Sequence, residues 1–257
     1  MKENFLHNKL AWKSFLSSVA KDIAEHDGIY SWSIYKKYQL AFSRPLKTDD
    51  LEYLSNFNIF SSYYLSSEDI NILENKFNVK KGQDDSVVIP VENFSLVGNK
   101  YKRIRTCMNN MNAKNFEIVY DYKKYDDILL FLERWDDTCG EKHFQSRTGK
   151  NKYFFKNNFH KEGISMFIYD GDRMIAFGVL SLPNIDGVSS YVIGKALCYD
   201  YKGLSEYADV KLYEIGRNNG VKEVNLGGGK DSVVFYKMKF PNAYRIESFD
   251  IKAVKNV

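Results

Sequence analysis

The last third of the chain holds residues whose types and spacing could support group transfer. Gly227, Gly228 and Gly229 follow a short apolar run, and Tyr236 and Lys237 come soon after them. Glycines lack a Cβ, so the backbone of such a turn can approach a ligand closely. A phenol can exchange a proton with a substrate, and an ammonium group can neutralise a developing negative charge. The alternatives are a plain strand-to-helix turn for the glycines, a packed core ring for Tyr236 and a solvated helix lysine for Lys237.

These residues belong to an alternating pattern of strands and helices that has to position them. Residues 191–199 are mostly apolar and predict a strand, and an apolar stripe over 204–215 predicts an amphipathic helix. Residues 221–226 predict a short buried strand. After the glycines, a last helix is expected to carry Tyr236 and Lys237.

The longer pattern resembles the GNAT-type acyltransferase superfamily. NLGGG at 225–229, followed by FYKMKF at 235–240, is similar to the strand, glycine turn and helix of bacterial tandem-GNAT relatives. These relatives include the Fem-type aminoacyltransferases and the phosphatidylglycerol lysyltransferase-like branch. The resemblance is strongest over residues 96–250. It implies an α/β (mixed α+β) GNAT-like fold with two tandem halves around a central mixed sheet, a degenerate half over 1–100 and an acyltransferase half over 101–257.

The resemblance also implies an activity. Enzymes of this kind move an acyl group from acyl-CoA, or an aminoacyl group from aminoacyl-tRNA, to the amine of a small molecule, an amino sugar or a cell-envelope precursor, without a metal. In GNAT enzymes the donor carbonyl sits in an opening between two central strands, here 191–199 and 221–226. The resemblance assigns Tyr236 to protonate the leaving group and Lys237 to neutralise a phosphate or a developing charge.

Donor binding is where the sequence departs from the CoA-dependent enzymes. Those enzymes hold the pyrophosphate with a Q/R-x-x-G-x-G/A loop at a helix N-terminus, but here residues 200–205 read DYKGLS. The donor contacts expected from the resemblance are Tyr199, Lys202 and Gly203, together with the three glycines of 227–229. The departure puts acyl-CoA in doubt and is similar to the Fem-type enzymes, although Lys202 and Gly203 could still hold a phosphate.

A run of cations precedes the second half. Lys100, Lys102, Arg103 and Arg105 lie within six residues. Such a run indicates either a solvated helix face or an anion-binding surface for a phosphate, a tRNA backbone or a lipid headgroup. On the second interpretation, Lys102 and Arg105 contact the substrate.

A polar stretch over 140–158 supplies the remaining candidates. It contains His143 and Arg147, which we predict as substrate contacts, and it ends just before His160. Long polar segments inside compact domains are often functional or mobile. His143 and His160 are candidate bases, but no Ser/His/Asp or Cys/His spacing supports that role, and an ordinary surface histidine is the alternative.

Composition limits the class of protein. The chain has 257 residues, of which 44% are hydrophobic and 16% aromatic, as expected for a globular protein with a sizeable core. A net charge of +4 does not by itself indicate nucleic acid. Three cysteines without CxxC spacing, the lack of a signal-peptide pattern and the lack of a long apolar stretch predict a soluble cytoplasmic protein, with peripheral membrane contact left open. The second hypothesis is a non-catalytic GNAT-like module that binds RNA or anionic lipid.

The remaining elements are expected to alternate between helices and strands. They are a helix over 9–25, strands over 34–42, 59–65 and 86–91, a helix that starts with a capping box at Ser66, a polar loop over 80–85, and a closing strand of the second half over 244–254.

Overall fold

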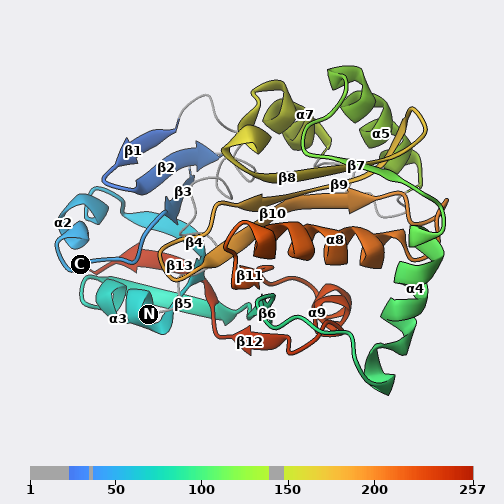
Figure 1. The fold of residues 1–257 in the computed structure, drawn as a ribbon. Helices are drawn as coiled ribbons and strands as arrows, with labels where there is room; N and C mark the ends of the chain where they lie inside the picture. Colours follow the sequence, from blue (N-terminus) through green and yellow to red (C-terminus); the bar gives the residue numbers. More distant parts are fainter. Residues whose placement is uncertain (1–22, 35–36, 139–147, 257) are drawn as a thin grey trace.

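The computed structural model describes residues 23–34, 37–138 and 148–256. In this part of the chain the strands form two mixed sheets, which lie side by side (Figure 1). The first sheet has six strands in the order β1 (Ala24–His26), β2 (Ile29–Ile34), β3 (Lys37–Phe42), β4 (Ile59–Leu65), β13 (Phe249–Lys255) and β5 (Phe77–Gln83). The second has seven in the order β12 (Tyr244–Ile246), β6 (Ser86–Pro90), β11 (Glu223–Asn225), β10 (Val188–Ala196), β9 (Arg173–Ser181), β8 (Gly163–Asp170) and β7 (Glu117–Val119).

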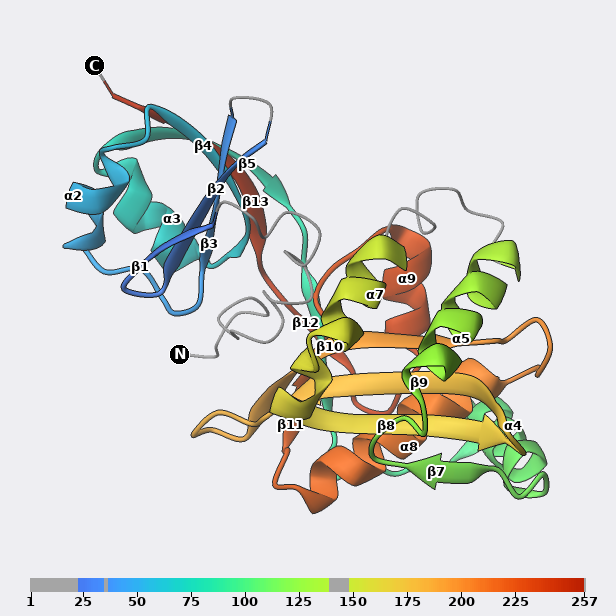
Figure 2. The ribbon, with the colours of Figure 1, turned by 90° about the horizontal axis from the view of Figure 1, so that it is seen from above.

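Helices cover both faces of the larger sheet (Figure 2). Strand β8 explains why: Met166 and Ile168 belong to one core cluster, whereas Phe167 and Tyr169 belong to another on the opposite face. Apolar residues on both sides of a strand require a packed layer on each side. Helices α4 (Lys102–Asn112) and α8 (Leu204–Asn218) supply one layer, and α5 (Tyr125–Thr138) and α7 (Thr148–Lys156) supply the other. Helix α9 (Asp231–Lys237) follows β11 and the glycine turn (Figure 1).

The smaller sheet has its own core. Helices α2 (Asp50–Leu54) and α3 (Ser67–Glu74) pack their apolar residues against it. The predicted capping box is confirmed, because the Ser66 side chain accepts from the Asp69 backbone while the Asp69 side chain accepts from Ser66. The predicted strand over 59–65 matches β4.

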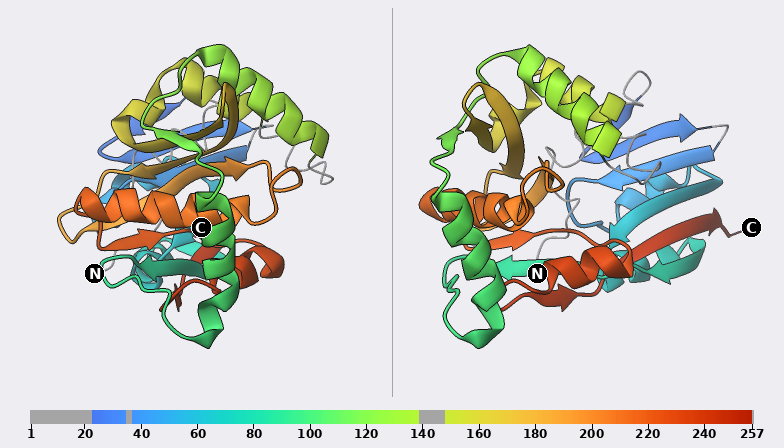
Figure 3. Two further views of the ribbon diagram at one scale, coloured as in Figure 1. Left: turned by 45° about the vertical axis from the view of Figure 1, so that its right-hand side comes forward. Right: turned by 90° about the vertical axis from the view of Figure 1, so that its right-hand side faces the viewer.

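Each sheet contains strands from distant parts of the sequence (Figure 3). Strand β6 lies in the larger sheet although it comes early in the sequence, and β13, the last strand, lies in the smaller one. The chain passes from the smaller to the larger sheet between β5 and β6, and it returns between β12 and β13. These two crossing segments are joined by the Asp84 N–H, which donates to the Ser248 carbonyl at 2.9 Å. The buried hydroxyls of Ser86 and Ser248 also lie 3.3 Å apart. The division at residue 100 stays a prediction, and these crossings tie its two sides together.

Three expectations from the sequence were wrong. Residues 80–85 are largely part of β5, whose exposed polar side chains conceal a strand that pairs through its backbone with β13. The expected helix over 9–25 conflicts with β1 at Ala24–His26, and the rest of that prediction lies outside the described residues. The expected closing strand over 244–254 breaks into β12 and β13, which belong to different sheets. The strand expected over 34–42 is β3, the second strand of a hairpin with β2.

The placement of β13 predicts an asymmetric response to mutation. Ala253 has an exposed fraction of 0% in the core of the smaller sheet, whereas its neighbour Lys252 is exposed. We expect Ala253→Asp to lower the free energy of unfolding by about 3 kcal/mol or more, because it buries a charge without a partner. Urea unfolding followed by circular dichroism measures this change. Lys252→Asp is the matched control on the same strand, and equal losses for the two variants would contradict the assigned register.

Candidate active site

Two neighbouring strands of the larger sheet pair over part of their length and then separate. Strands β10 and β11 run parallel and pair at three positions, the last being Ser190 with Asn225. Beyond this point β10 shifts register between Tyr191 and Ile193 and continues beside β9 to Ala196, while β11 ends. These are the two strands between which the sequence predicted an opening.

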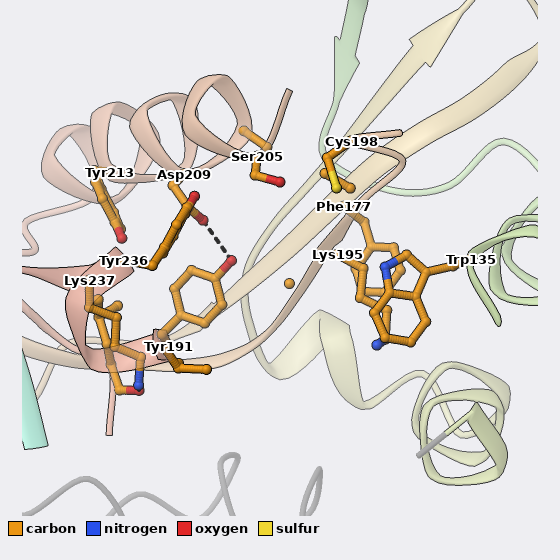
Figure 4. Close-up of a pocket in the computed structure, with 15 residues that line it drawn as sticks. Trp135, Phe177, Tyr191, Lys195, Cys198, Ser205, Asp209, Tyr213, Tyr236 and Lys237 are labelled. Atoms are coloured by element: carbon orange, nitrogen blue, oxygen red, sulfur yellow. Dashed lines mark hydrogen bonds between the residues drawn. The ribbon is translucent and has the colours of Figure 1, made fainter. Parts of the chain in front are cut away.

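A cavity of about 520 Å³ lies at the place where the strands separate. Its walls come from α5, β9, β10, α8 and α9 (Figure 4). They are mostly apolar, with a few polar groups grouped on the side of α8 and α9. The lining residues used below are Trp135, Phe177, Tyr191, Gly194, Asp209, Tyr213, Leu226, Val233, Tyr236 and Lys237.

A buried carboxylate on α8 organises the polar side of the cavity. Tyr191 donates its hydroxyl proton to Asp209 Oδ1 at 2.8 Å (Figure 4). Tyr236 donates to Asp209 Oδ2 at 2.7 Å. Asp209 is 9% exposed. A buried carboxylate is tolerated only where hydrogen bonds replace its water. The two phenols supply these bonds from β10 and α9.

Burial sets the titration of this group. It raises the pKa of Asp209 to about 6, and the bonds from Tyr236 and Tyr191 act in the opposite direction. Burial, with the Asp209 charge next, raises the pKa of both phenols well above the usual value. At neutral pH the carboxylate is therefore ionised and both phenols keep their protons.

An ion pair between Lys239 and Glu206 lies against the Tyr236 ring. Lys239 Nζ lies 3.4 Å from the centroid of the Tyr236 ring and donates to Glu206 Oε1 at 2.8 Å. A cation over a phenol ring is attracted by the ring quadrupole. The pair Lys239–Glu206 therefore fixes the ring between the carboxylate of Asp209 and the cation.

Lys237 points into the glycine turn. Its Nζ donates to the carbonyl oxygens of Leu226 at 2.7 Å and Gly227 at 2.8 Å, and also to that of Gly228. An ammonium group has three N–H donors, so these carbonyl groups use all of them. Burial lowers the pKa of Lys237 to about 8, which leaves it charged at pH 7. In this arrangement Lys237 holds the turn rather than a ligand phosphate.

The glycines of the turn are required by its geometry. A Cβ on Gly228 would lie 2.2 Å from Asp84 Oδ1, and Gly227 and Gly229 have φ values of 64° and 139°. The Gly229 N–H donates to the same Asp84 oxygen at 3.1 Å, and the Gly227 N–H donates to Asn225 Oδ1 at 2.8 Å. The turn is thus held both by Lys237 and by Asp84, which lies between β5 and β6, where the chain passes from one sheet to the other.

Comparison with known proteins identifies the family. The model of the family "Phosphatidylglycerol lysyltransferase, C-terminal" matches residues 52–238. The chain belongs to this family. It is a GNAT-like acyl or aminoacyl transferase, as the resemblance in the sequence implied. No curated protein sequence matches the chain.

Solved structures share the fold at low sequence identity. L-PGS from Bacillus licheniformis is 12% identical, with a TM-score of 0.64 over 88% of this chain and 80% of that one. The C-terminal domain of a putative lysylphosphatidylglycerol synthetase from Agrobacterium fabrum is 11% identical, with a TM-score of 0.67 over 97% of this chain and 88% of that one. FemX is 10% identical, with a TM-score of 0.60 over 93% and 90%. The predicted α/β, GNAT-like fold is confirmed.

Some of the residues that the sequence predicted as donor contacts lie away from the cavity. Tyr199 is 73% exposed, and Lys202 lines a separate hollow beside the C-terminal end of α4. Gly203 precedes α8 with a φ of 93°, and a Cβ there would lie 2.7 Å from Cys107 Sγ on α4. A tight packing of two helices accounts for this glycine. Ser205, in the first turn of α8, does line the cavity.

The predicted substrate contacts lie elsewhere or outside the described residues. Arg105 donates to the carbonyl oxygens of Leu96 and Gly98 and so holds the segment that leads into α4, whose first residue, Lys102, is exposed. His143 and Arg147 lie outside the part of the chain that the structure describes.

His160 is a buried residue of the core layer under α7. It is 0% exposed and bonds Asp121 through Nε2 at 3.0 Å. Burial lowers the pKa of His160, so the ring is neutral at pH 7. It lines a separate hollow together with Tyr120 and Ser165, not the cavity of Tyr236.

The sequence prediction missed Tyr191 and Asp209. A signal for Asp209 was present, because it stands between Ala208 and Val210 in the most apolar part of its helix. A carboxylate in that position is either exposed by helix rotation or buried with partners, and burial of nearly every side of α8 decides for the second.

The role of Lys237 gives a second testable prediction. We expect Lys237→Ala to lower the free energy of unfolding by about 2 kcal/mol, because three carbonyl oxygens of 226–228 lose their donor. Chemical denaturation measures the loss. Lys230→Ala is the matched control, since Lys230 is exposed just before α9, and we expect a change within about 0.5 kcal/mol. If the two variants behaved alike, the turn would not depend on Lys237.

Proposed function

We propose that this enzyme transfers an aminoacyl group from aminoacyl-tRNA to the glycerol hydroxyl of phosphatidylglycerol. The observation that carries the proposal is the cavity between β10 and β11, which presents two tyrosine hydroxyls to the point where a donor carbonyl enters in GNAT-like folds. The name of the family supplies the lipid acceptor. The chain's cavity, hydroxyls and Asp209 supply the groups that such a transfer needs.

The segment before α8 argues against acyl-CoA as the donor. Asp200 accepts from Arg134 at 3.0 Å and from Arg173 at 2.6 Å, and the bond from Arg134 holds the pKa of Asp200 below its usual value. An ionised carboxylate here repels a pyrophosphate, and both arginines are already engaged by it. An aminoacyl-tRNA needs no pyrophosphate site at this place.

Exposed cations near α4 support a nucleic-acid donor. Lys100, Lys102 and Arg103 are exposed at the start of this helix, which packs against α8. Cations on an exposed helix bind a phosphate backbone in a salt-dependent way. The cations thus lie on the layer of the sheet that carries Asp209.

Apolar walls support a lipid acceptor over a sugar. Trp135, Phe177, Leu226 and Val233 line the cavity, and Phe235, on the same helix as Tyr236, is 80% exposed. A sugar acceptor needs polar walls, whereas a glycerol headgroup with attached acyl chains can lie against apolar ones. Within the described residues, no helix is long and apolar enough to cross a membrane.

A transfer assay tests the proposal. Purified protein is mixed with tRNA charged with a radiolabelled amino acid and with vesicles of phosphatidylglycerol or of phosphatidylcholine. We expect label in the lipid fraction with phosphatidylglycerol only, and an initial rate that falls steeply as salt rises. Tyr120→Phe is the control, because Tyr120 is 70% exposed and lies away from the cavity. Transfer from acetyl-CoA to an amine, with none from charged tRNA, would overturn the proposal.

A further inference from the structure

The hydrogen-bond directions at Asp209 restrict what Tyr236 can do. A phenol has one proton, and Tyr236 gives it to Asp209 Oδ2 while Tyr191 gives its own to Oδ1. An ionised carboxylate only accepts, so neither bond can run the other way. Toward the cavity, each phenol oxygen can therefore offer only a lone pair. A group that enters with an O–H can donate to Tyr236, but a leaving oxygen cannot receive a proton from it in this state.

We propose that Tyr236 and Asp209 form a proton relay that first removes the proton of the attacking hydroxyl and later returns it to the leaving oxygen. Tyr236 is the catalytic residue that touches the substrate, and Asp209 is a positioning residue that acts through it. The inference rests on the proposed function for the identity of the substrates. It adds the direction of proton movement, which is opposite at the first step to the acid role expected from the sequence.

The relay balances protons over the two steps of transfer. As the acceptor oxygen bonds to the donor carbonyl carbon, its proton passes to Tyr236 Oη and the Tyr236 proton passes to Asp209 Oδ2. In the second step the bond between the carbonyl carbon and the tRNA ribose oxygen breaks. The proton then returns from Asp209 through Tyr236 to that ribose oxygen. The enzyme ends in its starting protonation state, and no other reactant is needed.

The surroundings of Asp209 suit a group that takes and gives back a proton. The titratable and charged groups that face it are Glu206 and Tyr213 on α8, Tyr191 on β10, and Tyr236, Lys237 and Lys239 on or just after α9. Lys239 is paired with Glu206 and Lys237 with backbone carbonyls, so neither cation forms a salt bridge with Asp209. Burial dominates, and the resulting pKa of about 6 lies close enough to neutrality for a reversible transfer.

Tyr191 holds the second carboxylate oxygen. Its hydroxyl lies where a Cβ on Gly194 would be, at 1.9 Å, so only a glycine at that position leaves room for the phenol. Because Tyr191 stabilises the ionised form, it keeps the pKa of Asp209 lower than burial alone would set it. Loss of this bond should therefore raise the pKa of Asp209 without removing the relay.

The pH dependence of transfer tests the relay. Asp209 must be ionised to accept a proton, so we expect the wild-type rate to rise with pH through about 6 and then level off. Tyr236→Phe and Asp209→Asn should each lower the plateau rate by about 100-fold. Asp209→Asn should also abolish the rise of the rate with pH, which is the acidic limb of the pH–rate profile. Asp209→Glu should restore part of the rate and an acidic limb. Tyr191→Phe should move the limb to higher pH.

The matched control lies on the same helix. Tyr207 is a buried tyrosine of α8 whose ring contacts Phe116 rather than the cavity. Tyr207→Phe should keep the wild-type rate and pH profile. An Asp209→Asn enzyme with an unchanged acidic limb, or a Tyr191→Phe enzyme with an unshifted limb, would overturn the relay.

A measurement without substrate separates this proposal from the function on which it rests. Infrared difference spectra of wild type and Asp209→Asn report the carboxyl C=O band as pH is lowered. We expect a band that titrates near pH 6 in wild type and is missing in the variant. Without such a band the relay fails even if transfer occurs. With the band but without transfer from charged tRNA, the substrate assignment fails and the acid–base pair stands.

Discussion

The buried carboxylate of Asp209 is the constraint on which the site depends. An ionised group in a mostly apolar cavity is costly unless hydrogen bonds replace its lost water. Here those bonds come from Tyr191 on β10 and Tyr236 on α9, two elements that are separated in sequence by the whole of α8. The carboxylate thus fixes how β10, α8 and α9 are placed around the opening of the sheet.

A second set of contacts keeps that opening in shape. Lys237 binds the carbonyl groups of the glycine turn, and Asp84 accepts a hydrogen bond from its Gly229 N–H. Asp84 lies on a crossing segment, and its backbone bonds Ser248 on the other one. The smaller sheet is therefore coupled to the site through a short chain of hydrogen bonds, although its own core cluster is separate. This coupling gives the smaller sheet a structural role at the glycine turn.

Much of the fold could be predicted from periodicity, and the failures have physical causes. The pattern of α8 and the capping box at Ser66 are local features that the sequence carries directly. Strand β5 is mostly polar, because its stability comes from backbone pairing with β13 rather than from a buried face. Which sheet a strand joins depends on contacts far away in sequence, so the exchange of β6 and β13 had no local signal.

The site shows the same limit. The order of glycines, tyrosine and lysine located the turn and α9, because a family resemblance transfers positions along the chain. The resemblance could not predict that the Lys237 ammonium would bind the carbonyl groups of the turn or that Tyr236 would bind a carboxylate. Both facts depend on which way side chains point in the folded protein. Asp209 was missed because a lone acidic residue in a helix is usually solvated.

The pairing of charges inside the site has a consequence for how it selects substrates. Asp209 is bonded to two hydroxyls, Lys237 to carbonyl groups and Lys239 to Glu206, so these ions are oriented before any ligand arrives. Groups that are already oriented need little reorganisation as charge develops, which favours the reaction step over tight binding of the ground state. Recognition of the acceptor then falls to shape and to apolar walls such as Trp135 and Phe177. Because Trp135 lies on α5 and the carboxylate lies on α8, a substitution at Trp135 can change the wall that meets the acceptor without disturbing Asp209.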